Sequence, residues 1–574
     1  MMRYITIKVF LLTLTFFIQY GETFQCGVPQ LKKHIGTQII PDVPSAPAHP
    51  AAPELQIGSQ RTFFAIDFAK KQQYTINTTL RGSGPHCYIY VEDSEWRRNV
   101  SPLTVQTIQN AFDFSTPADP RRGIYQILTE DLGTLPDIDR NQKVILLLLN
   151  IRDVGNTHST VGYFMPIDQR RGILQHPTLG PLHSNVGEIL YIDARDELVN
   201  NFQMQAVIAH ELQHIIHWKH SPKEETWIDE GCANYAAFRC GYDIYQHVKA
   251  FQEAPNTSLI DWTQTTQTNI LAHYGAAFIF MMYLHDHYGG LETISDLVKN
   301  PLDGISGITN TLEARGMSST FSNVFSDWKV ANYLTTWRLL GSIGRQYRYI
   351  TFKPIISPQF IHNSYPVNRR NETLANFAAH AIDCKVASTD QTGLNLSFIT
   401  QRNTKIDIKV AYLRDSGEIS VQSLPFRTTD GTATLDLPTF GSTVKRAILI
   451  PSLQVENPSF AQQSITYNYN VFEGGLGTYS TVILPNPVHP NYWEIIAVPD
   501  EPTGIVSLTV TLTYQNRNLI EDKPMVSIQN DDKTRYRYAF HLNQEIDTEA
   551  VEWSIQRGDT IIDEGFINKT TNGK

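Results

Sequence analysis

The pattern of apolar residues changes twice along the chain, and these changes constrain the fold more than any other feature. Short apolar runs between turn residues predict β-strands from about Arg61 to Asp193. Helical periodicity then dominates from about Leu198 to Leu334. From about Ile350 onward, alternating runs recur between clusters of Gly, Pro and Asn, which favours one or two β-sandwich modules. A chain of 574 residues also exceeds one hydrophobic core, so we expect roughly three or four folded units.

Local sequence predicts the individual elements. In the first region the strand candidates are residues 62–66, 87–91, 143–151 and 188–193. The third of these is continuously apolar, which indicates a buried central strand. The helix candidates are residues 203–217, 227–245, 274–288 and 320–334. In the last region the clearest alternating runs are residues 394–398, 447–450 and 506–512, with a soft break near residues 474–479.

The N-terminus predicts export. Residues 1–24 have positive charge at Arg3 and Lys8 and an apolar run over Val9–Ile18, which is typical of a secretory signal peptide and too short to span a bilayer. An uncleaved membrane anchor is the alternative, because no clean small-x-small cleavage pattern follows. Residues 25–60 include a Pro/Ala-rich stretch and predict a linker or a pro-segment. We therefore expect a secreted, extracellular protein with no stable membrane insertion after signal cleavage.

Charge and cysteine content exclude two classes. The net charge of -10 gives no basic footprint for nucleic acid, so we expect no nucleic-acid partner. Five cysteines in a chain of this length do not form a disulfide framework. Cys232 and Cys240 lie about two turns apart in one predicted helix, beyond disulfide reach of each other.

One stretch of the helical region carries residues that bind metals. In HELQH, His210 and His214 share a helix face, because four residues advance about 6 Å and turn about 40° past one rotation. Two imidazoles so placed can bind one tetrahedral Zn²⁺. Glu211 lies beside the first ligand, where it can take a proton from a zinc-bound water. The pentapeptide alone is not decisive, since a chain with 18 His can carry it by chance.

A second element supplies the missing ligand. The stretch WIDEG, Trp227–Gly231, lies on a predicted helix after the break at Ser221 and Pro222. A catalytic zinc site needs three protein ligands and one open position for water. Glu230 completes that set, so the sequence predicts Zn²⁺ bound by His210, His214 and Glu230.

HELQH followed by WIDEG resembles the gluzincin clan of zinc metallopeptidases, in which a Glu on a downstream helix completes the zinc site. The longer block at residues 209–238 resembles the secreted bacterial hyicolysin-like metallopeptidases. The resemblance extends over about a third of the chain, including PDID at 136–139, VGYFMP at 161–166 and FSDWKVANYL at 325–334. The downstream β-rich half contributes nothing to it.

The resemblance implies a fold for the first part of the chain. We expect an α+β zincin-like metallopeptidase domain over residues 61–340, with a mixed sheet, an active-site helix and then a helical subdomain. Two all-β modules follow in this interpretation. They are a β-sandwich-like domain over residues 345–478 and an Ig-like β-domain over residues 479–574.

Additional histidines in the HELQH helix leave a rival ligand set open. Metzincins use H-E-x-x-H-x-x-G-x-x-H, and His220 occupies the last position of that spacing. The Gly of that pattern is His217 here, and a helix continuing through it carries His220 about 15 Å along the axis from His210. We therefore favour Glu230 over His220. His217 shares a face with His210 and either lines the cleft or, more simply, is a polar surface residue.

A few further residues are candidates for holding a zinc-bound imidazole in place or for binding the substrate. Asn234 lies one turn after Glu230, where its amide oxygen can accept the free N–H of a zinc-bound imidazole, or it is an ordinary surface residue. The resemblance implies a Tyr or His donor near the scissile carbonyl, and His273-Tyr274 matches that position. We favour Tyr274 over His273, with a packing role as the alternative for either.

Two further segments have alternative interpretations. In this peptidase architecture a strand such as Glu188–Asp193 forms the upper rim of the cleft, but it can equally be an internal strand. Asp137, Asp139 and Asn141 match the start of a calcium loop but lack its Gly and distal Glu. We interpret these three residues as a turn before the central strand.

Together these features predict a secreted zinc endopeptidase acting on a protein or peptide substrate. Glu211 is the expected base, and Tyr274 is the expected donor to the oxyanion. One alternative is a non-catalytic exported binding or adhesion protein that retains a metal site. In that case the C-terminal β modules, which can contact a surface or polymer, are the functional part. Another alternative is a zinc hydrolase acting on a non-peptide bond.

Overall fold

The computed structural model describes most of the chain beyond the N-terminal segment. The described residues are 23–29, 31, 54–153, 158–195, 203–262, 269–339, 341–387, 393–429, 431–456, 464–474, 479–485, 489, 491–499, 506–515, 517–530, 533–542, 551–557 and 560–567. Most of the predicted signal peptide and of the Pro/Ala-rich segment therefore lies outside them. Among these residues, no helix combines the length and apolar character needed to cross a membrane.

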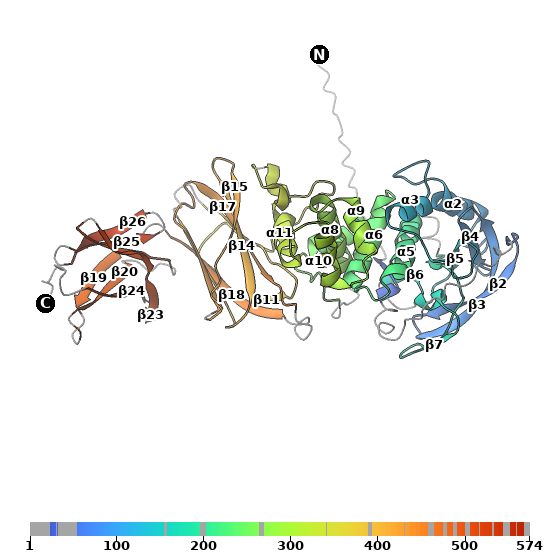
Figure 1. The fold of residues 1–574 in the computed structure, drawn as a ribbon, viewed down its shortest axis with the longest axis horizontal. Coiled ribbons are helices and arrows are strands. Elements are labelled where there is room, and N and C mark those ends of the chain that lie inside the picture. The colour runs from blue at the N-terminus through green and yellow to red at the C-terminus, as the bar shows by residue number, and fades with distance from the viewer. Residues whose placement is uncertain are drawn as a thin grey trace, which may run out of the picture.

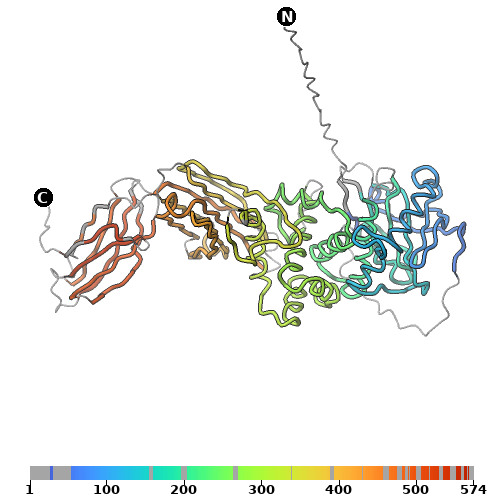
Figure 2. Tube along the Cα trace, turned by 90° about the horizontal axis from the view of Figure 1, so that it is seen from above, coloured from blue at the N-terminus to red at the C-terminus, as the bar shows by residue number. Residues whose placement is uncertain are grey.

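The protein is elongated, with three kinds of structure in succession (Figures 1 and 2). An α+β region lies at one end, a group of helices follows, and two β-rich regions extend to the other end. The coarse prediction of an α+β region followed by β modules is confirmed. The exact domain boundaries stay predictions, since residues 340 and 475–478 are outside the described part.

A seven-stranded mixed sheet forms the base of the α+β region. Its spatial order is β1-β6-β9-β5-β4-β3-β2. The strands are β1 (Thr23–Cys26), β2 (Gln60–Asp67), β3 (Gln72–Ser83), β4 (Cys87–Glu92), β5 (Val144–Leu149), β6 (His158–Phe164) and β9 (Ile189–Asp193). β4, β5 and β9 run parallel, β6 is antiparallel to β9, and β1 is parallel to β6. A small hairpin, β7 (Ile173–His176) and β8 (Gly180–His183), lies between β6 and β9 in the chain.

The continuous apolar run gives the central strand that the sequence predicted. All six residues of β5 are buried, because β4 and β9 flank the strand and helices cover the sheet. Helices α2 (Pro102–Asp113), α3 (Ile124–Asp131) and α5 (Gln203–His220) contact one another, and α2 and α5 also contact the sheet. Helix α5 lies against β6 and β9, so the HELQH segment is held at this end of the sheet.

The helical group continues the same core. Its members are α6 (Thr226–Arg239), α7 (Tyr245–Glu253), α8 (Ile270–His287), α9 (Leu291–Val298), α10 (Gly304–Ala314) and α11 (Phe321–Leu334). Helix α8 is buried over its first fifteen residues, from Ile270 to Leu284, and it packs against both α6 and α7. A helix that is apolar on all sides suits such a central position.

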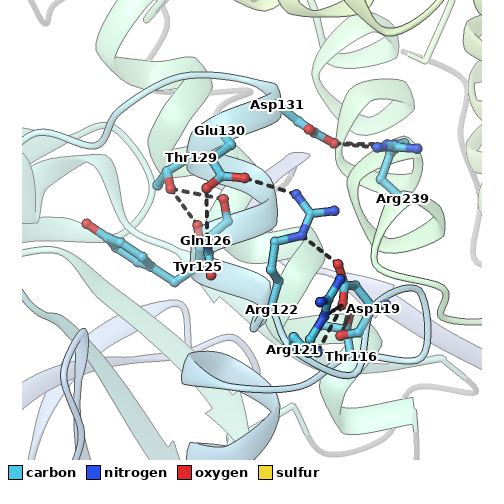
Figure 3. Close-up of polar contacts among 10 residues, drawn as sticks. All are labelled: Thr116, Asp119, Arg121, Arg122, Tyr125, Gln126, Thr129, Glu130, Asp131 and Arg239. Carbon is cyan, nitrogen blue, oxygen red and sulfur yellow. Dashed lines mark hydrogen bonds and ion pairs between the residues drawn. The ribbon is translucent and has the colours of Figure 1, made fainter.

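The predicted single helix over residues 227–245 is wrong at its C-terminal end. Helix α6 stops at Arg239, and Gly241 adopts a positive φ of 84° that turns the chain toward α7. Arg239 binds Asp131 at the end of α3 through Nε and Nη2 at 3.0 and 2.8 Å. Figure 3 shows this ion pair beside the Asp119–Arg122–Glu130 contacts of the neighbouring loop and helix. The ion pair fixes α6 against α3.

The β-rich half consists of two pairs of sheets, each pair sharing one core. The first pair contains β10 (Phe360–His362), β11 (Val367–Ala375), β12 (Ile382–Lys385), β13 (Leu394–Thr400), β14 (Ile406–Arg414), β15 (Ile419–Ser423), β16 (Thr432–Leu437), β17 (Val444–Leu453) and β18 (Ser464–Glu473). The second contains β19 (Tyr479–Pro485), β20 (Tyr492–Pro499), β21 (Thr509–Tyr514), β22 (Arg517–Pro524), β23 (Val526–Asn530), β24 (Lys533–His541), β25 (Val551–Arg557) and β26 (Thr560–Phe566). Helix α11 joins the first pair to the helical group, because its buried Lys329 binds Asp407 at 2.8 Å.

Candidate metal centre

Helix α5 presents the two histidines of HELQH on one side. Their ring centroids lie 4.9 Å apart, as expected for positions four residues apart. Apolar residues on other faces of α5, including Ile208, Leu212 and Ile215, are fully buried and hold the helix in the core. The imidazoles of His210 and His214 are thus carried by a rigid element.

Helix α6 brings Glu230 to both imidazoles. Glu230 Oε2 lies 3.0 Å from His210 Nε2 and 3.7 Å from His214 Nε2, and the carboxylate is fully buried. Gly231 permits the close approach of α6 to α8, since a Cβ there would lie 3.0 Å from the carbonyl oxygen of Ala277. The three residues predicted as zinc ligands therefore converge.

A fourth ligand atom lies at the same place. The Sγ of Cys26, at the end of β1, is 3.6 Å from His214 Nε2. One potential ligand atom from each of Cys26, His210, His214 and Glu230 lies within 4.8 Å of the other three. All four residues are buried. The sequence analysis did not include Cys26 in the site.

This group of residues fits Zn²⁺. Zinc–nitrogen, zinc–oxygen and zinc–sulfur bonds of about 2.0–2.3 Å in a tetrahedron place neighbouring ligand atoms about 3.3–3.8 Å apart. The separations given above, from 3.0 to 3.7 Å, are close to this range. Among the described residues, Glu230 Oε1 is buried without a hydrogen-bond partner, which an ion beside the carboxylate would compensate. A set of nitrogen, oxygen and sulfur donors also favours zinc over Mg²⁺ or Ca²⁺.

A buried polar side chain lies next to the Nδ1 atom of each of these two histidines. His210 Nδ1 lies 3.2 Å from Asn234 Oδ1, which is the contact the sequence analysis expected for Asn234. His214 Nδ1 lies 3.1 Å from Asp229 Oδ1. Such partners fix the tautomer of a metal-binding imidazole and leave its Nε2 free to coordinate.

His217 does not line the cleft and is not a surface residue, so both interpretations of it are wrong. It is buried one turn below His214, with Nδ1 3.0 Å from Asp229 Oδ1 and Nε2 3.6 Å from Glu224 Oε2. Asp229 therefore lies between two imidazoles, those of His214 and His217. We call the four potential metal ligands, Cys26, His210, His214 and Glu230, the metal group. The contacts of His217 and Asp229 extend the polar network from the metal group into the core.

Glu211 lies beside the ligands and close to β6. A Cβ on Gly162 would come within 3.1 Å of Glu211 Oε1, so the VGYFMP motif provides a glycine where the carboxylate needs room. Burial raises the pKa of Glu211, and the charges of His214 and His210 offset part of this rise. A raised pKa brings a carboxylate closer to the neutral range in which a general base is effective.

The electrostatics of the group favour a bound cation. Burial would lower the pKa of His214, but the charges of Asp229 and Glu230 and hydrogen bonds to both raise it to about 10. Burial opposes ionisation of Glu230, yet His214 and His210 hold its pKa below the ordinary value. A site that binds a proton so strongly can bind a metal ion in its place.

Tyr274 reaches the site, whereas His273 does not. The Tyr274 hydroxyl donates to the carbonyl oxygen of Cys26 at 3.3 Å, and its ring is stacked on His247. Burial raises the pKa of Tyr274 well above its usual value, so the hydroxyl stays protonated and remains a donor. His273 instead packs beside Trp262, 5.4 Å between ring centroids, and burial lowers its pKa to about 4.

A pocket of about 220 Å³ adjoins the metal group. Its walls come from β1, β6, α5, α6 and the start of α7, and they include Cys26, His210 and Glu211 together with several apolar residues. The apolar lining residues include Val161, Ala206, Val207, Ala237 and Ile244. The chain thus has a largely apolar pocket beside the proposed base and metal ligands.

The remaining predicted features have clear outcomes. Helix α5 continues to its last residue, His220, which does not join the metal group. Strand β9 lies between β6 and β5, so the interpretation of residues 188–193 as the cleft rim is wrong and the internal-strand alternative holds.

Near the start of β5, Asn141 N and Nδ2 donate to Asp139 in a turn, and Asp137, Asp139 and Glu188 form an acidic group.

The five cysteines are all described, and all are free thiols.

Sequence reasoning missed Asp229 and Cys26 for different reasons. Asp229 directly precedes the ligand Glu230, and a search for a carboxylate partner to each imidazole would have found it. Cys26 lies far from HELQH in the sequence, and only the pairing of β1 with β6 brings it to the site.

A comparison with protein-family models found no match, and a comparison with curated proteins found none either.

Proposed function

We propose that this protein is a secreted zinc endopeptidase of the gluzincin type, with a zincin-like catalytic domain ahead of its β modules. The observation that carries the proposal is the convergence of two buried imidazoles and one carboxylate beside a second, separate carboxylate, Glu211. A metal site needs the first three groups. Glu211 is additional, and a site that only binds metal has no need of it.

His210, His214 and Glu230 would hold the ion. Zinc supplies a water of lowered pKa and polarises the carbonyl of the scissile bond. Asn234 and Asp229 keep the two imidazoles in the orientation that binding requires. The helix-borne ligands stay fixed during the reaction, because α5 and α6 are packed in the core.

Glu211 is the residue that moves the proton. Its carboxylate takes one proton from the attacking water and then delivers it to the nitrogen of the leaving amine. The Tyr274 hydroxyl, when it is not bonded to Cys26, is a donor for the carbonyl oxygen as negative charge develops there. The largely apolar pocket beside Glu211 accepts a substrate side chain next to the scissile bond.

The test compares wild type with Glu211→Gln and with Glu313→Gln, an exposed residue of α10, on a fluorogenic peptide library. Wild type should hydrolyse peptides, lose this activity with a chelator and regain it with zinc. Glu211→Gln should bind zinc normally and lose at least about 100-fold in kcat/KM, since a positioned base contributes about 10²–10⁴-fold. Glu313→Gln should match wild type.

The same experiment separates the alternatives. Zinc binding without hydrolysis of any peptide, by wild type and by Cys26→Ala alike, would favour a binding protein or a hydrolase of another bond. Hydrolysis that survives in Glu211→Gln would remove Glu211 as the base. In either case, contact with a surface or polymer through the β modules would remain a separate property to test.

A further inference from the structure

We propose that Cys26 is a fourth zinc ligand and that the segment containing β1 holds the enzyme in a latent form. This inference rests on the proposed function, because a latent form presupposes an activity. Three protein ligands leave one coordination position for water. In this structure a thiol from the N-terminal segment lies where a fourth ligand would be.

The position of the sulfur carries the first step. Cys26 Sγ is 3.6 Å from His214 Nε2 and belongs to the same compact group as His210 and Glu230. The side chain is buried, and the backbone N–H of Val28 donates to the sulfur at 3.3 Å. Cysteine binds zinc as the thiolate, and this N–H bond offsets only part of the rise in the pKa of Cys26 that burial and the charges of Glu211 and Glu230 cause.

The second observation is the backbone pairing of β1 with β6. β1 is the edge strand of the sheet and pairs with β6 from Thr23 to Cys26, and Gly27 N then donates to Gly162 O at 2.9 Å. Without β1, strand β6 would offer this edge beside Glu211, where an extended peptide can add as a strand. β1 therefore occupies the backbone positions that a substrate would use.

The same segment also contacts Tyr274 and the pocket beside Glu211. The Tyr274 hydroxyl donates to the carbonyl oxygen of Cys26, so it is not available to a substrate carbonyl. Cys26 also forms part of the wall of the pocket beside Glu211. One short stretch of chain thus occupies the fourth coordination position, the edge of β6 and the hydroxyl of Tyr274.

The segment is held by non-covalent contacts. Val28 and Leu31 are buried in the core of the α+β region. A Cβ on Gly27 would lie only 3.0–3.1 Å from Phe68, Thr160 and Tyr163, which makes this a tight fit for glycine. All five cysteines are free, so no disulfide prevents the segment from leaving.

The chemistry of latency needs only a proton and a water. The Cys26 thiol gives up its proton, to Glu211 beside it or to solvent, as its sulfur binds the ion in place of water. When the segment leaves, water takes the place of the sulfur and the thiolate takes up a proton. Only the S–H bond and the bond between sulfur and the ion are exchanged, so no oxidant, reductant or cleavage of the polypeptide is required. Cleavage of the predicted signal peptide after residue 24 would remove Thr23 and Phe24 from β1 but leave Gln25, Cys26 and the bond from Gly27 N to Gly162 O on the exported chain.

The decisive experiment replaces zinc with Co²⁺ in the full chain and records its absorption spectrum. Wild type should show a sulfur-to-cobalt charge-transfer band in the near ultraviolet, and X-ray absorption of the zinc form should show one sulfur at about 2.3 Å. Cys26→Ser should bind one Co²⁺ and lose the band. Cys384→Ser, which alters a buried free thiol in the first β module, should keep it.

Activity and labelling give independent readouts. Cys26→Ala should hydrolyse peptides at least about 10-fold faster than wild type, because the ion regains its open position. Introducing Glu211→Gln into that variant should remove the gain. Iodoacetamide should modify Cys26 more slowly in the zinc-loaded protein than in the metal-free protein, as measured by mass spectrometry of peptides.

The outcomes distinguish this inference from the proposed function. Cobalt bound by wild type without a sulfur band, or equal labelling of Cys26 with and without zinc, would overturn the fourth ligand while leaving the peptidase intact. A sulfur band in Cys26→Ser equal to that of wild type would also overturn it. Failure of both proteins to bind any metal would instead count against the proposed function. The wild-type measurements stand even if the Cys26 variants do not fold.

Discussion

Buried charge is arranged differently in the β modules and at the candidate metal centre. In the first β module, Asp383 is fully buried and binds Arg446 through two bonds of 2.7 and 2.6 Å. Arg557 of the second module binds Asp436 of the first in the same paired manner. At the candidate metal centre, the buried carboxylates of Glu211, Asp229 and Glu230 instead surround imidazoles.

The contrast separates charge that supports a fold from charge that serves a site. The charges of an Asp–Arg pair compensate each other without a bound ion, so removing one partner mainly affects stability. A set of carboxylates and imidazoles that meets at one point is satisfied by a cation there. We therefore expect substitutions in the β modules and at the candidate metal centre to have separable effects.

The largest expected effect is on metal binding at Glu230. Glu230→Gln removes the only carboxylate of the predicted ligand set, so zinc affinity should fall by at least about 1,000-fold and peptide hydrolysis should vanish. Competition with a chromophoric chelator measures the affinity. Zinc should no longer raise the thermal unfolding midpoint of the variant as it does for wild type. Unchanged zinc affinity would exclude Glu230 as a ligand.

The opposite result is expected for Asp383→Ala. It leaves the partly buried Arg446, which also lies over the ring of Trp337, without its carboxylate partner. We expect a loss of about 2–4 kcal/mol in the free energy of unfolding of this module, with zinc affinity within about twofold of wild type. Urea unfolding followed by tryptophan fluorescence measures the first quantity. A large loss of zinc affinity would contradict the separation between the β modules and the candidate metal centre.

An intermediate effect is expected at Asp229. Asp229→Asn keeps the size of the side chain but removes the charge that faces both His214 and His217. Partners of this kind usually contribute 10–100-fold to metal affinity, so we expect a loss of about that size with the fold retained. The matched control is Asn234→Asp, which adds a charge behind His210 and should not weaken zinc binding. Equal affinity in Asp229→Asn and wild type would limit Asp229 to packing.

Much of the arrangement behind these predictions could be derived from sequence. Spacing on a helix placed His210 and His214 together, and the need for a third ligand led to Glu230. The continuous apolar run gave the buried strand β5, since parallel strands are covered on both faces. The structure brings these three side chains together and buries β5, because both features follow from local periodicity or from the geometry that one ion would require.

The parts that failed depend on contacts between distant segments. Nothing local in residues 188–193 says whether β9 is internal or at an edge, because strand order is decided by β6 and β1. His217 looked like a surface residue, because its partners Glu224 and Asp229 reach it only after α6 folds back on α5. Cys26 is the extreme case, since its role depends on one strand pairing across most of the domain.

The smallest expected effect concerns pH and the buried Asp168, next to the VGYFMP strand. Its Oδ2 accepts from the Tyr191 hydroxyl at 2.5 Å, and burial raises its pKa from the usual 3.8 to about 7. Because the folded state binds this proton more tightly than the unfolded state, its contribution to stability is fully present below about pH 4. It is lost as the pH rises through 7.

Asp168→Asn keeps the side chain neutral at every pH. We expect the unfolding midpoint of wild type to fall between pH 5 and pH 8, and the variant to lose less, with a difference of at most about 3 kcal/mol in unfolding free energy. Calorimetry of the metal-free proteins at both pH values measures this, with the exposed Asp415→Asn as the control. Burial also raises the pKa of Glu188 to about 8 and of Asp193 to about 6, so part of the decline should persist in the variant. An equal decline in Asp168→Asn and wild type would show that the buried proton resides on these other carboxyls, because a neutral amide at position 168 cannot release one.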